Sequence, residues 1–487
     1  MTWGLAWCKQ SVHAAVAVSL LLLSTASQSE LAVGEEQKRP NILFILADDL
    51  SHSTVGINGT DQPQTPSLNR LASEGTVFTH AYNQGGWHGA ICVASRSMLN
   101  TGCFLWHAQR RARELDRERN AGRLWSQYLR GAGYQTYFSG KWHLQTDASA
   151  IFDVARHVRP GMPQDTPQSY HRPRENDSWK PWDRAQGGYW EGGRHWSEVL
   201  ADDACDYLAE AAEQDKPFFM YLAFNAPHDP RQAPREFIDL YPLSEVSLPV
   251  AFLTEYPDKD AIGCGPDLRD EKLAPFPRTP RAIKVHRQEY YGIISHMDKQ
   301  IGRILDALNQ SKLTDNTYVI FSSDHGLAVG SHGLLGKQNM YDHSVRIPFC
   351  IKGPSIAAGK RDSAPIYLQD VMPTTLELAG VPIPKHVDFR SLLPLLSHQR
   401  NEHYKAIYGA YMERQRMVTE DGYKLILYPR IKKVLLFNLR ADPHELQNLA
   451  AHPEQRERVK KLFSRLLELQ QETGDSLDLE QFYPGLS

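Results

Sequence analysis

The stretch PNILFILADD, residues 40–49, decides the fold of this 487-residue chain. Residues 42–47 are all apolar, as is typical of a parallel strand that is buried on both faces of its sheet. The run ends in Asp48 and Asp49, and open α/β sheets bind their ligands at the carboxyl ends of their strands. The stretch therefore predicts a central parallel strand with a functional site at its end.

Three further apolar runs also end in acidic, basic or imidazole side chains. They are residues 316–323, which lead to Asp324 and His325, residues 217–224, which lead to His228, and residues 135–139, which lead to Lys141 and His143. A turn, cap or surface role would explain each of these residues taken singly. Because parallel strands end at one edge of a sheet, their coincidence favours a shared site at that edge.

Helical patterns between these strands supply the connections that a parallel sheet requires. They cover residues 124–131, 196–213 and 289–308. The predicted fold is therefore α/β, with a doubly wound mixed sheet flanked by helices, and we assign it to a catalytic domain over residues 38–393.

The chain changes character after about residue 394. Short strands are predicted over residues 406–412, 423–428 and 434–439, and an amphipathic helix over residues 454–471. Residues 394–487 are therefore expected to form a smaller α+β subdomain, an antiparallel sheet with a helix, that packs on the catalytic domain and helps to close its pocket.

Charge and the N-terminal sequence limit where the protein acts. The formal net charge of −3 implies no general attraction to nucleic acid or to an anionic membrane surface. Lys9 precedes the apolar residues 14–23 and the small residues 24–27, an order typical of a secretory signal peptide, expected over residues 1–29. A short membrane anchor is the alternative, but a spanning helix needs about 20 apolar residues. We expect export to the periplasm or the medium, without stable membrane insertion.

Removal of such a leader leaves an odd number of cysteines in a compartment that permits disulfides. They are Cys92, Cys103, Cys205, Cys264 and Cys350. Their spacings contain no CxxC or Cys/His cluster suited to structural zinc. Cys92 is the thiol that we expect to be unpaired, because Arg96 follows four positions later and residues from Ser97 onward are expected to open a helix.

The polar residues at the strand ends predict a divalent cation beside a bound oxyanion. Carboxylate oxygens favour calcium or magnesium over softer metals, and an imidazole is a less usual partner. The predicted ligands are Asp48, Asp49, Asp324 and His325. A positive pocket beside them suits a tetrahedral anion such as sulfate or phosphate. Its predicted lining is Arg96, Lys141, His143, His228 and Lys337.

These residues resemble a known family. Residues 92–96, CVASR, match the signature Cys-x-(Pro/Ala)-x-Arg of the type I sulfatases, which belong to the alkaline phosphatase-like superfamily. Further blocks resemble the family in its own order and cover nearly the whole mature chain. They are NILFILADD (41–49), TPSLNRLA (65–72), GKWHL (140–144), APH (226–228), SDHG (323–326) and LFNLRADPHELQNL (436–449). The chain resembles bacterial exported polysaccharide sulfatases in particular.

The resemblance implies a sulfuric ester hydrolase whose Cys92 is oxidised to formylglycine by a formylglycine-generating enzyme. The aldehyde hydrate offers one hydroxyl as the nucleophile and a second that later expels the product. One cation, calcium with magnesium as the alternative, would be held by Asp48, Asp49, the modified Cys92, Asp324 and His325. Asp324-His325 stands where many members have Asp-Asn, a variation shared with iduronate sulfatases.

The resemblance also implies the remaining catalytic roles. Arg96 and the metal would keep the nucleophilic hydroxyl partly deprotonated, and Lys141 would steady the hydrate. His228 would protonate the leaving alcohol while Lys337 neutralises the sulfate oxygens. His143 would take the proton from the second hydroxyl.

A sulfated saccharide, such as an ulvan-like polysaccharide, is the expected substrate. Residues 179–196, WKPWDRAQGGYWEGGRHW, interleave aromatic rings, which stack on sugars, with cations, which pair with anionic groups. Ordinary core packing is the alternative. The expected substrate contacts are Trp182, Arg184, Arg194 and His195, with His52 and His88 near the carboxylates and the thiol. Two rival functions are a phosphate or phosphonate ester hydrolase of the same superfamily and a catalytically silent protein that binds sulfated glycans.

Overall fold

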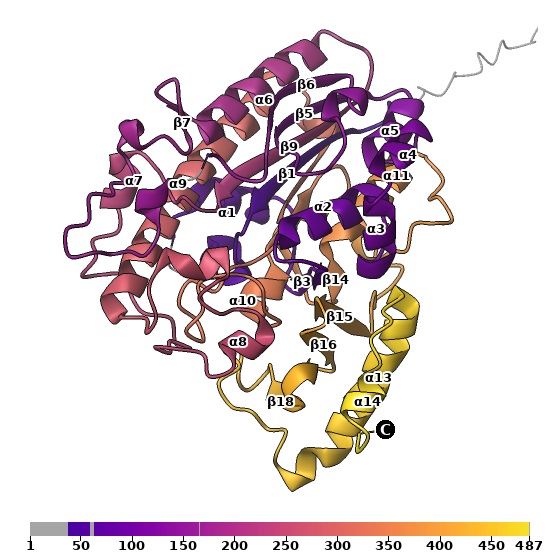
Figure 1. Cartoon of the computed structure of the whole chain (residues 1–487). Coiled ribbons are helices and arrows are strands. Elements are labelled where there is room, and N and C mark those ends of the chain that lie inside the picture. Colours follow the sequence, from indigo (N-terminus) through magenta and orange to yellow (C-terminus); the bar gives the residue numbers. More distant parts are fainter. Residues whose placement is uncertain (1–37, 59–62, 165, 487) are drawn as a thin grey trace, which may run out of the picture. The chain divides into compact units, whose positions relative to one another are not determined.

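An eight-stranded mixed sheet is the centre of the fold (Figure 1). The computed structural model describes residues 38–58, 63–164 and 166–486, so the expected signal peptide over residues 1–29 lies outside the described residues. The strand order is β13-β2-β12-β10-β1-β9-β5-β6. The strands from β10 to β6 run parallel, whereas β12 is antiparallel to β10. The predicted α/β fold with a mixed sheet is confirmed.

The strands of this sheet are β1 (Asn41–Asp48), β2 (Thr76–Phe78), β5 (Gln135–Lys141), β6 (Val154–Arg159), β9 (Phe218–Pro227), β10 (Thr317–Ser323), β12 (Phe349–Lys352) and β13 (Lys360–Asp362). The four strands predicted from the sequence are β1, β5, β9 and β10. Strand β5 is two residues longer than its apolar run, because Gly140 and Lys141 remain paired with β6. Lys141 is therefore part of the sheet.

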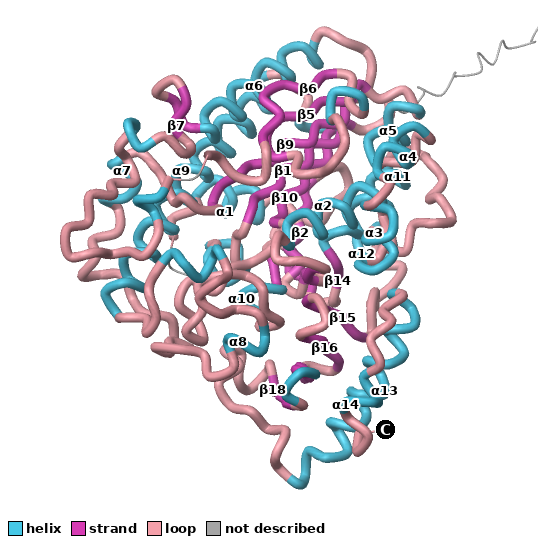
Figure 2. Tube along the Cα trace, in the orientation of Figure 1, coloured by secondary structure: helices cyan, strands magenta, loops and turns pink. Residues whose placement is uncertain are grey.

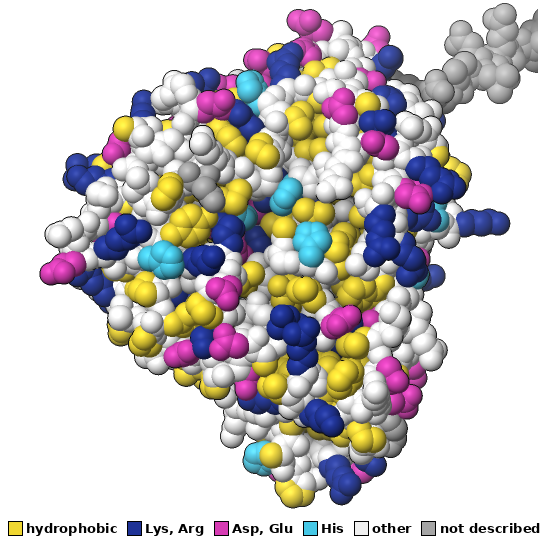
Figure 3. Space-filling view, viewed as in Figure 1, with side chains coloured by type: hydrophobic (Ala, Val, Ile, Leu, Met, Phe, Trp, Pro, Cys, Tyr) yellow, Lys and Arg dark blue, Asp and Glu magenta, His cyan; other side chains and the backbone are white. Residues whose placement is uncertain are grey.

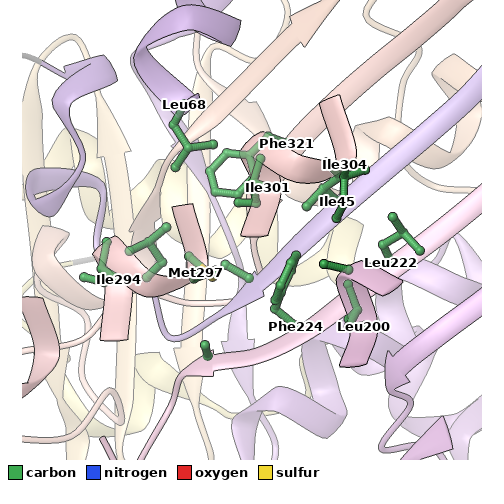
Figure 4. Close-up of a cluster of buried hydrophobic side chains, with 14 of the residues drawn as sticks. Ile45, Leu68, Leu200, Leu222, Phe224, Ile294, Met297, Ile301, Ile304 and Phe321 are labelled. Atoms are coloured by element: carbon green, nitrogen blue, oxygen red, sulfur yellow. The ribbon is translucent and has the colours of Figure 1, made fainter. Parts of the chain in front are cut away.

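Every residue of β1 is buried, because helices cover both faces of the sheet (Figure 2). Leu43, Ile45 and Ala47 face a core shared with the helices of one side, part of which is drawn in Figure 4. Those helices are α1 (Pro66–Ser73), α6 (Trp196–Ala212) and α9 (Pro280–Gln310). Phe44 points the other way and packs against Trp125, with ring centroids 5.2 Å apart. The helices of that side are α2 (Ile91–Thr101), α5 (Trp125–Gly131) and α11 (Val371–Leu378).

Helix α9 is longer than its sequence pattern indicated. It was expected over residues 289–308 but begins at Pro280, where proline suits the first helical position because its missing N–H would have no partner there. Thr279 caps this end, since its hydroxyl oxygen accepts a hydrogen bond from the Ala282 N–H at 3.1 Å.

Replacing Thr279 with alanine should lower the free energy of unfolding by about 1 kcal/mol, the usual cost of losing an N-cap oxygen. Thr279→Ser keeps the hydroxyl and should stay close to the wild type. Urea denaturation followed by circular dichroism measures both variants. Equal stability of the alanine and serine variants would contradict the capping role.

A second, five-stranded sheet has the order β18-β17-β16-β15-β4. Its strands are β4 (Gly85–Gly86), β15 (Ala406–Tyr411), β16 (Gln415–Glu420), β17 (Tyr423–Tyr428) and β18 (Lys433–Asn438). The sequence pattern missed β16, whose polar Gln415 and Arg416 are buried. Strand β4 adds a parallel edge to the expected antiparallel sheet. Gly85 has a left-handed φ of 85°, and a Cβ there would lie 2.1 Å from the Ala410 carbonyl oxygen, so only glycine fits.

The C-terminal helix α13 (Arg456–Thr473) packs against this sheet, and the two share a buried apolar cluster with residues of α2 and α3. The shorter elements are α3 (Leu105–Ala112), α4 (Leu115–Asn120), α7 (Arg235–Asp239), α8 (Lys259–Ile262), α10 (Asp342–Val345), α12 (Leu393–Leu396), α14 (Leu479–Phe482), β3 (Ala81–Tyr82), β7 (Trp190–Glu191), β8 (Arg194–His195), β11 (Arg346–Ile347) and β14 (Ile366–Tyr367). Strand β4 lies just before α2 and pairs with β15, so the C-terminal sheet is hydrogen-bonded to the segment that leads to Cys92.

Basic and acidic side chains are interspersed over the face drawn in Figure 3, as the small net charge suggests. Within the described residues no helix is both long enough and apolar enough to cross a membrane. The five cysteines of this part of the chain are all free thiols, and four of them, including Cys92, are buried.

Candidate active site

The ends of four neighbouring parallel strands bring the predicted site residues together. Strands β5, β9, β1 and β10 are adjacent, so their carboxyl ends lie at one edge. Asp48 is the last residue of β1 and Lys141 the last of β5, while His228 and Asp324 directly follow β9 and β10. This arrangement places acidic, basic and imidazole groups around Cys92, which comes from α2.

Helix α2 begins at Ile91, so the predicted start at Ser97 is wrong and Cys92 lies in the first turn of the helix. The β-branched Ile91 and Val93 disguise the helix, since such residues favour strands. Ile91, Ala94 and Met98 share one buried apolar cluster, and this packing outweighs local propensity. Four residues make about one turn, so Cys92 and Arg96 project from the same side of the helix.

Three buried cations neutralise three buried carboxylates around the thiol. Arg96 donates to Asp48 at 2.7 Å and to Asp324 at 3.1 Å. The Lys141 ammonium lies 2.5 Å from the Asp48 carboxylate. Lys337 lies 2.5 Å from an Asp49 oxygen and 3.1 Å from the Cys92 sulfur. Because the charges of the cluster cancel, its members tolerate burial without solvent.

Burial and these cations set the charge of each group. Burial would raise the pKa of Asp48, but Lys141 and Arg96 hold it well below its usual range. Burial, with the neighbouring Asp48 carboxylate, raises the pKa of Asp324 to about 6. Burial also raises the pKa of the Cys92 thiol well above its ordinary value, and the Asp324 and Asp48 charges add to this effect. The unmodified thiol is therefore protonated, and a protonated thiol is a poor nucleophile.

The donor set fits a divalent cation. One ligand atom from each of Asp48, Asp49, Cys92 and Asp324 lies within 4.8 Å of all the others. His228 forms a second such group with Asp48 and Cys92, whereas the predicted ligand His325 belongs to neither group. The buried Nε2 of His325 has no hydrogen-bond partner among the described residues, and its Nδ1 contacts the Asn83 amide. Three carboxylates and an orphaned ring nitrogen suit a hard cation such as calcium.

Two histidines stand beside this cluster. The His228 Nε2 lies 3.7 Å from an Asp49 oxygen, and its Nδ1 donates to the Asp229 carbonyl oxygen at 2.8 Å. Burial and Lys337 lower the pKa of His228 to about 3. His143 has a left-handed φ of 56°, and a Cβ on Gly161 would lie 2.3 Å from its ring, so this glycine makes room for it. Burial and Lys141 lower the pKa of His143 to about 2, so both rings are neutral.

The aromatic and basic segment over residues 179–196 uses its side chains in packing. His195 is fully buried, where its Nδ1 accepts from the Ser197 N–H and caps α6. Trp182 packs against the main core, with the Arg235 guanidinium 5.4 Å from its ring. The Arg184 guanidinium lies over Trp190, and Arg194 pairs with Asp202. His195 is thus committed to packing and Trp182 is partly buried, whereas Arg184 and Arg194 are exposed, and their contact with substrate stays a prediction.

The other two expected substrate contacts differ in position. His88 is half-buried just before α2, where its Nδ1 accepts from the Ala90 N–H at 3.1 Å. It therefore lies on the segment that carries Cys92. His52 lines a different cavity together with His332 and His343, so the structure does not bring it into the charged cluster.

Sequence reasoning missed several residues that hold the site. Asn83 donates to the Asp324 carbonyl oxygen at 2.6 Å and contacts His325. Gln338 and Asp229 are sequence neighbours of the predicted Lys337 and His228, which is the signal that could have identified them. Arg269 approaches His228 from a short helix 41 residues later in the sequence, and no local pattern marks it.

The fold and this charged edge define an α/β protein with an alkaline phosphatase-like architecture. The family model "Sulfatase" matches residues 40–381, and a second model, "N-sulphoglucosamine sulphohydrolase, C-terminal", matches residues 330–472. The chain therefore belongs to the sulfatase family, and it is a sulfuric ester hydrolase.

Curated relatives resemble the chain over most of their length. A sulfatase of Formosa agariphila is 28% identical over 465 residues, which cover 89% of this chain and 87% of the relative. An ulvan-active sulfatase of the same species is 26% identical over 499 residues, or 96% of this chain and 88% of the relative.

Solved structures share the fold. The structure of BT4656 in complex with its substrate D-glucosamine-2-N,6-O-disulfate has a TM-score of 0.70 and 23% identity, covering 90% of this chain and 99% of that one. The phosphonate monoester hydrolase of Agrobacterium radiobacter has a TM-score of 0.70 and 21% identity, covering 89% and 96%.

Proposed function

We propose that this sulfuric ester hydrolase removes sulfate from a sulfated saccharide, with a formylglycine formed from Cys92 and one divalent cation, calcium with magnesium as the alternative. The observation that carries the proposal is the position of the Cys92 sulfur, 3.6 Å from Asp48, 3.8 Å from Asp49 and 3.1 Å from Lys337. A thiol that stays protonated in such a cluster has no evident use unless it is converted. An aldehyde hydrate at this position would replace it with two hydroxyls, one to attack the sulfate ester and one to expel the product.

The cation would be held by the oxygens of Asp48, Asp49 and Asp324, by His325 Nε2, and by the group formed from Cys92. When bound, a divalent cation polarises a sulfate oxygen and lowers the pKa of a hydroxyl beside it. The charges of the carboxylates and cations in this cluster already cancel, so the ion would give the site the net positive charge that an anionic sulfate ester requires.

The cationic side chains of this chain orient and neutralise the reacting groups. Arg96 holds Asp48 and Asp324 in register, and Lys141 holds Asp48, so the nucleophile would lie at a fixed distance from both carboxylates. Lys337 contacts both Asp49 and the Cys92 sulfur, and we assign it to the charge that develops on the sulfate oxygens.

The neutral histidines are assigned to proton transfers. The Nδ1–H of His228 is committed to the Asp229 carbonyl oxygen, so the neutral ring has no proton on Nε2. His228 would therefore take up a second proton from solvent when the anionic ester binds and would give it from Nε2 to the leaving alcohol. His143 would accept the proton of the second hydroxyl, and its buried Nδ1 has no hydrogen-bond partner within the described part of the chain.

A sulfated saccharide is the proposed substrate class because two similar proteins, the ulvan-active sulfatase and BT4656, act on or bind sulfated sugars. An ulvan-like polysaccharide or its oligosaccharides are the specific proposal, and a formylglycine-generating enzyme is the proposed maturation partner. We also propose export of the protein, since such polymers are met outside the cell.

Removal of the cation should abolish turnover. Chelation with EDTA is expected to lower kcat for a sulfate ester more than about 100-fold, since the Lewis acid contributes several kcal/mol to charge stabilisation. Calcium added after dialysis should restore the rate and raise Tm, because the ion binds only the folded protein. Full activity of protein from which the metal has been removed, verified by elemental analysis, would contradict the proposed metal site.

The function itself is tested on protein co-expressed with a formylglycine-generating enzyme. The Cys92 peptide should lose two hydrogens and carry oxygen in place of sulfur, and sulfated oligosaccharides should release sulfate. Faster hydrolysis of phosphate or phosphonate esters than of sulfate esters would favour the rival hydrolase. A thiol that stays unmodified beside a generator that works on other targets would favour the glycan-binding protein.

A further inference from the structure

Arg269 reaches the site from a segment that the catalytic roles above do not use. It opens the short helix η6 (Arg269–Leu273), and its guanidinium lies 3.5 Å from His228 Nε2. The same guanidinium pairs with Asp229, the neighbour of His228, and lies 2.5 Å from the Asp270 carboxylate. The side chain is 32% exposed, so it lies between the buried cluster and solvent.

Asp270 ties this arginine to two other parts of the site. Its second oxygen accepts from the Gln338 amide at 2.8 Å. Gln338 also donates to the Gly89 carbonyl oxygen at 3.0 Å and accepts from the Lys337 N–H at 3.0 Å. The buried Asp270 therefore joins η6, the Lys337 loop and the segment that leads into α2.

The local charges decide what Arg269 can do. Asp229 and Asp270 are both buried and face the guanidinium, so two negative charges oppose its one positive charge. A group compensated in this way attracts a second anion weakly. Its planar guanidinium, however, contacts four partners at once, namely Asp229, Asp270, His228 and Tyr170, and this fixes geometry in a way that the single ammonium of a lysine cannot.

We propose that Arg269 and Asp270 are positioning residues that hold the His228 ring so that Nε2 faces the leaving-group oxygen. The inference rests on the proposed function, in which His228 protonates the leaving alcohol. Arg269 orients His228 directly and through Asp229, while Asp270 anchors Arg269 to Gln338.

The test compares two sulfate esters that carry no second anionic group. Nitrophenolate leaves without a proton, whereas phenolate needs one, and general acid catalysis contributes about 10²–10⁴-fold. Arg269→Lys keeps the charge and should lower kcat/KM less than about 3-fold for 4-nitrophenyl sulfate but about 30-fold or more for phenyl sulfate. Asp270→Asn should likewise lower the rate for phenyl sulfate more than the rate for 4-nitrophenyl sulfate. It replaces Arg269→Lys in the experiment if the lysine variant does not fold.

A double-mutant cycle and a matched control complete the experiment. In a His228→Gln background, measured on aryl sulfates or on whichever sulfated saccharide is turned over, Arg269→Lys should add less than about a 2-fold loss, because residues that act through one another are not additive. Arg117→Lys, in an exposed pair with Glu114, should change neither rate.

The outcomes separate the two proposals. Equal losses on both esters, or a full further loss in the His228→Gln background, would overturn the positioning role and leave the sulfatase proposal standing. A Michaelis constant that rises only for saccharides with a second anionic group would make Arg269 a substrate contact instead. A wild-type protein with a matured Cys92 that hydrolyses no sulfate ester would refute the proposed function.

Discussion

Replacing Cys92 with alanine is expected to lower kcat/KM for sulfate esters by more than about 10⁴-fold while the protein stays folded. Alanine removes the sulfur that is to be converted, so no oxygen nucleophile can form between Asp48, Asp49 and Lys337. The change removes one buried atom and leaves the charges of the cluster in balance, so a cooperative melting transition should remain. The measurement is sulfate release by ion chromatography, with circular dichroism as the check on folding.

Cys205→Ala is the matched control for this variant. Cys205 lies on α6 and is half-buried. Its replacement should leave both the rate and the melting curve close to those of the wild type. Residual activity of Cys92→Ala within about 10-fold of wild type would place the nucleophile elsewhere and withdraw the catalytic assignment of this residue.

Replacing Arg96 with methionine is expected to lower the free energy of unfolding by about 3–5 kcal/mol, the range found when one partner of a buried ion pair is removed. Arg96 is fully buried and binds Asp48 and Asp324 together, so its loss leaves buried negative charge that only Lys141 and Lys337 oppose. Urea denaturation in the presence of EDTA measures the loss. Added calcium should restore part of the stability, because it brings positive charge to the same carboxylates.

Arg117→Met provides the matched comparison. The Arg117 guanidinium is 74% exposed and pairs with Glu114 on the surface, where a salt bridge contributes only about 0–1 kcal/mol. If Arg96→Met lowers the free energy of unfolding no more than this control does, then other groups neutralise the Asp48 and Asp324 charges.

Much of the fold follows from local sequence patterns, and each wrong prediction has an identifiable physical cause. The centres of strands β1, β9 and β10 are apolar runs because helices cover both of their faces, and such runs stand out in the sequence. Strand β16 carries a buried arginine whose partner, Asp475, lies 59 residues away, so its pattern looks exposed. The start of α2 was misplaced because β-branched residues fill its first turn.

In the candidate site, too, some residues could be predicted from the local sequence and others could not. Asp48, Lys141 and Asp324 could be predicted because strand ends are marked by the change from apolar to charged residues. His195 and Trp182 were expected to contact substrate, since a sequence shows that rings and cations alternate but not which way they point. The buried His195 and the partly buried Trp182 depend on partners such as Gln232 and Arg235 from later segments.

The sequence by itself determined the parallel α/β sheet, the order of its strands along the chain and the residue types at their ends, because those features depend on periodicity and on neighbours in the chain. Only the tertiary structure decided that β4 joins the C-terminal sheet and that Arg269 meets His228. It also decided how three cations are shared among three carboxylates. The physical reason is that charge balance and hydrogen bonding in a buried site are settled between atoms that are close in space, whatever their separation in the chain.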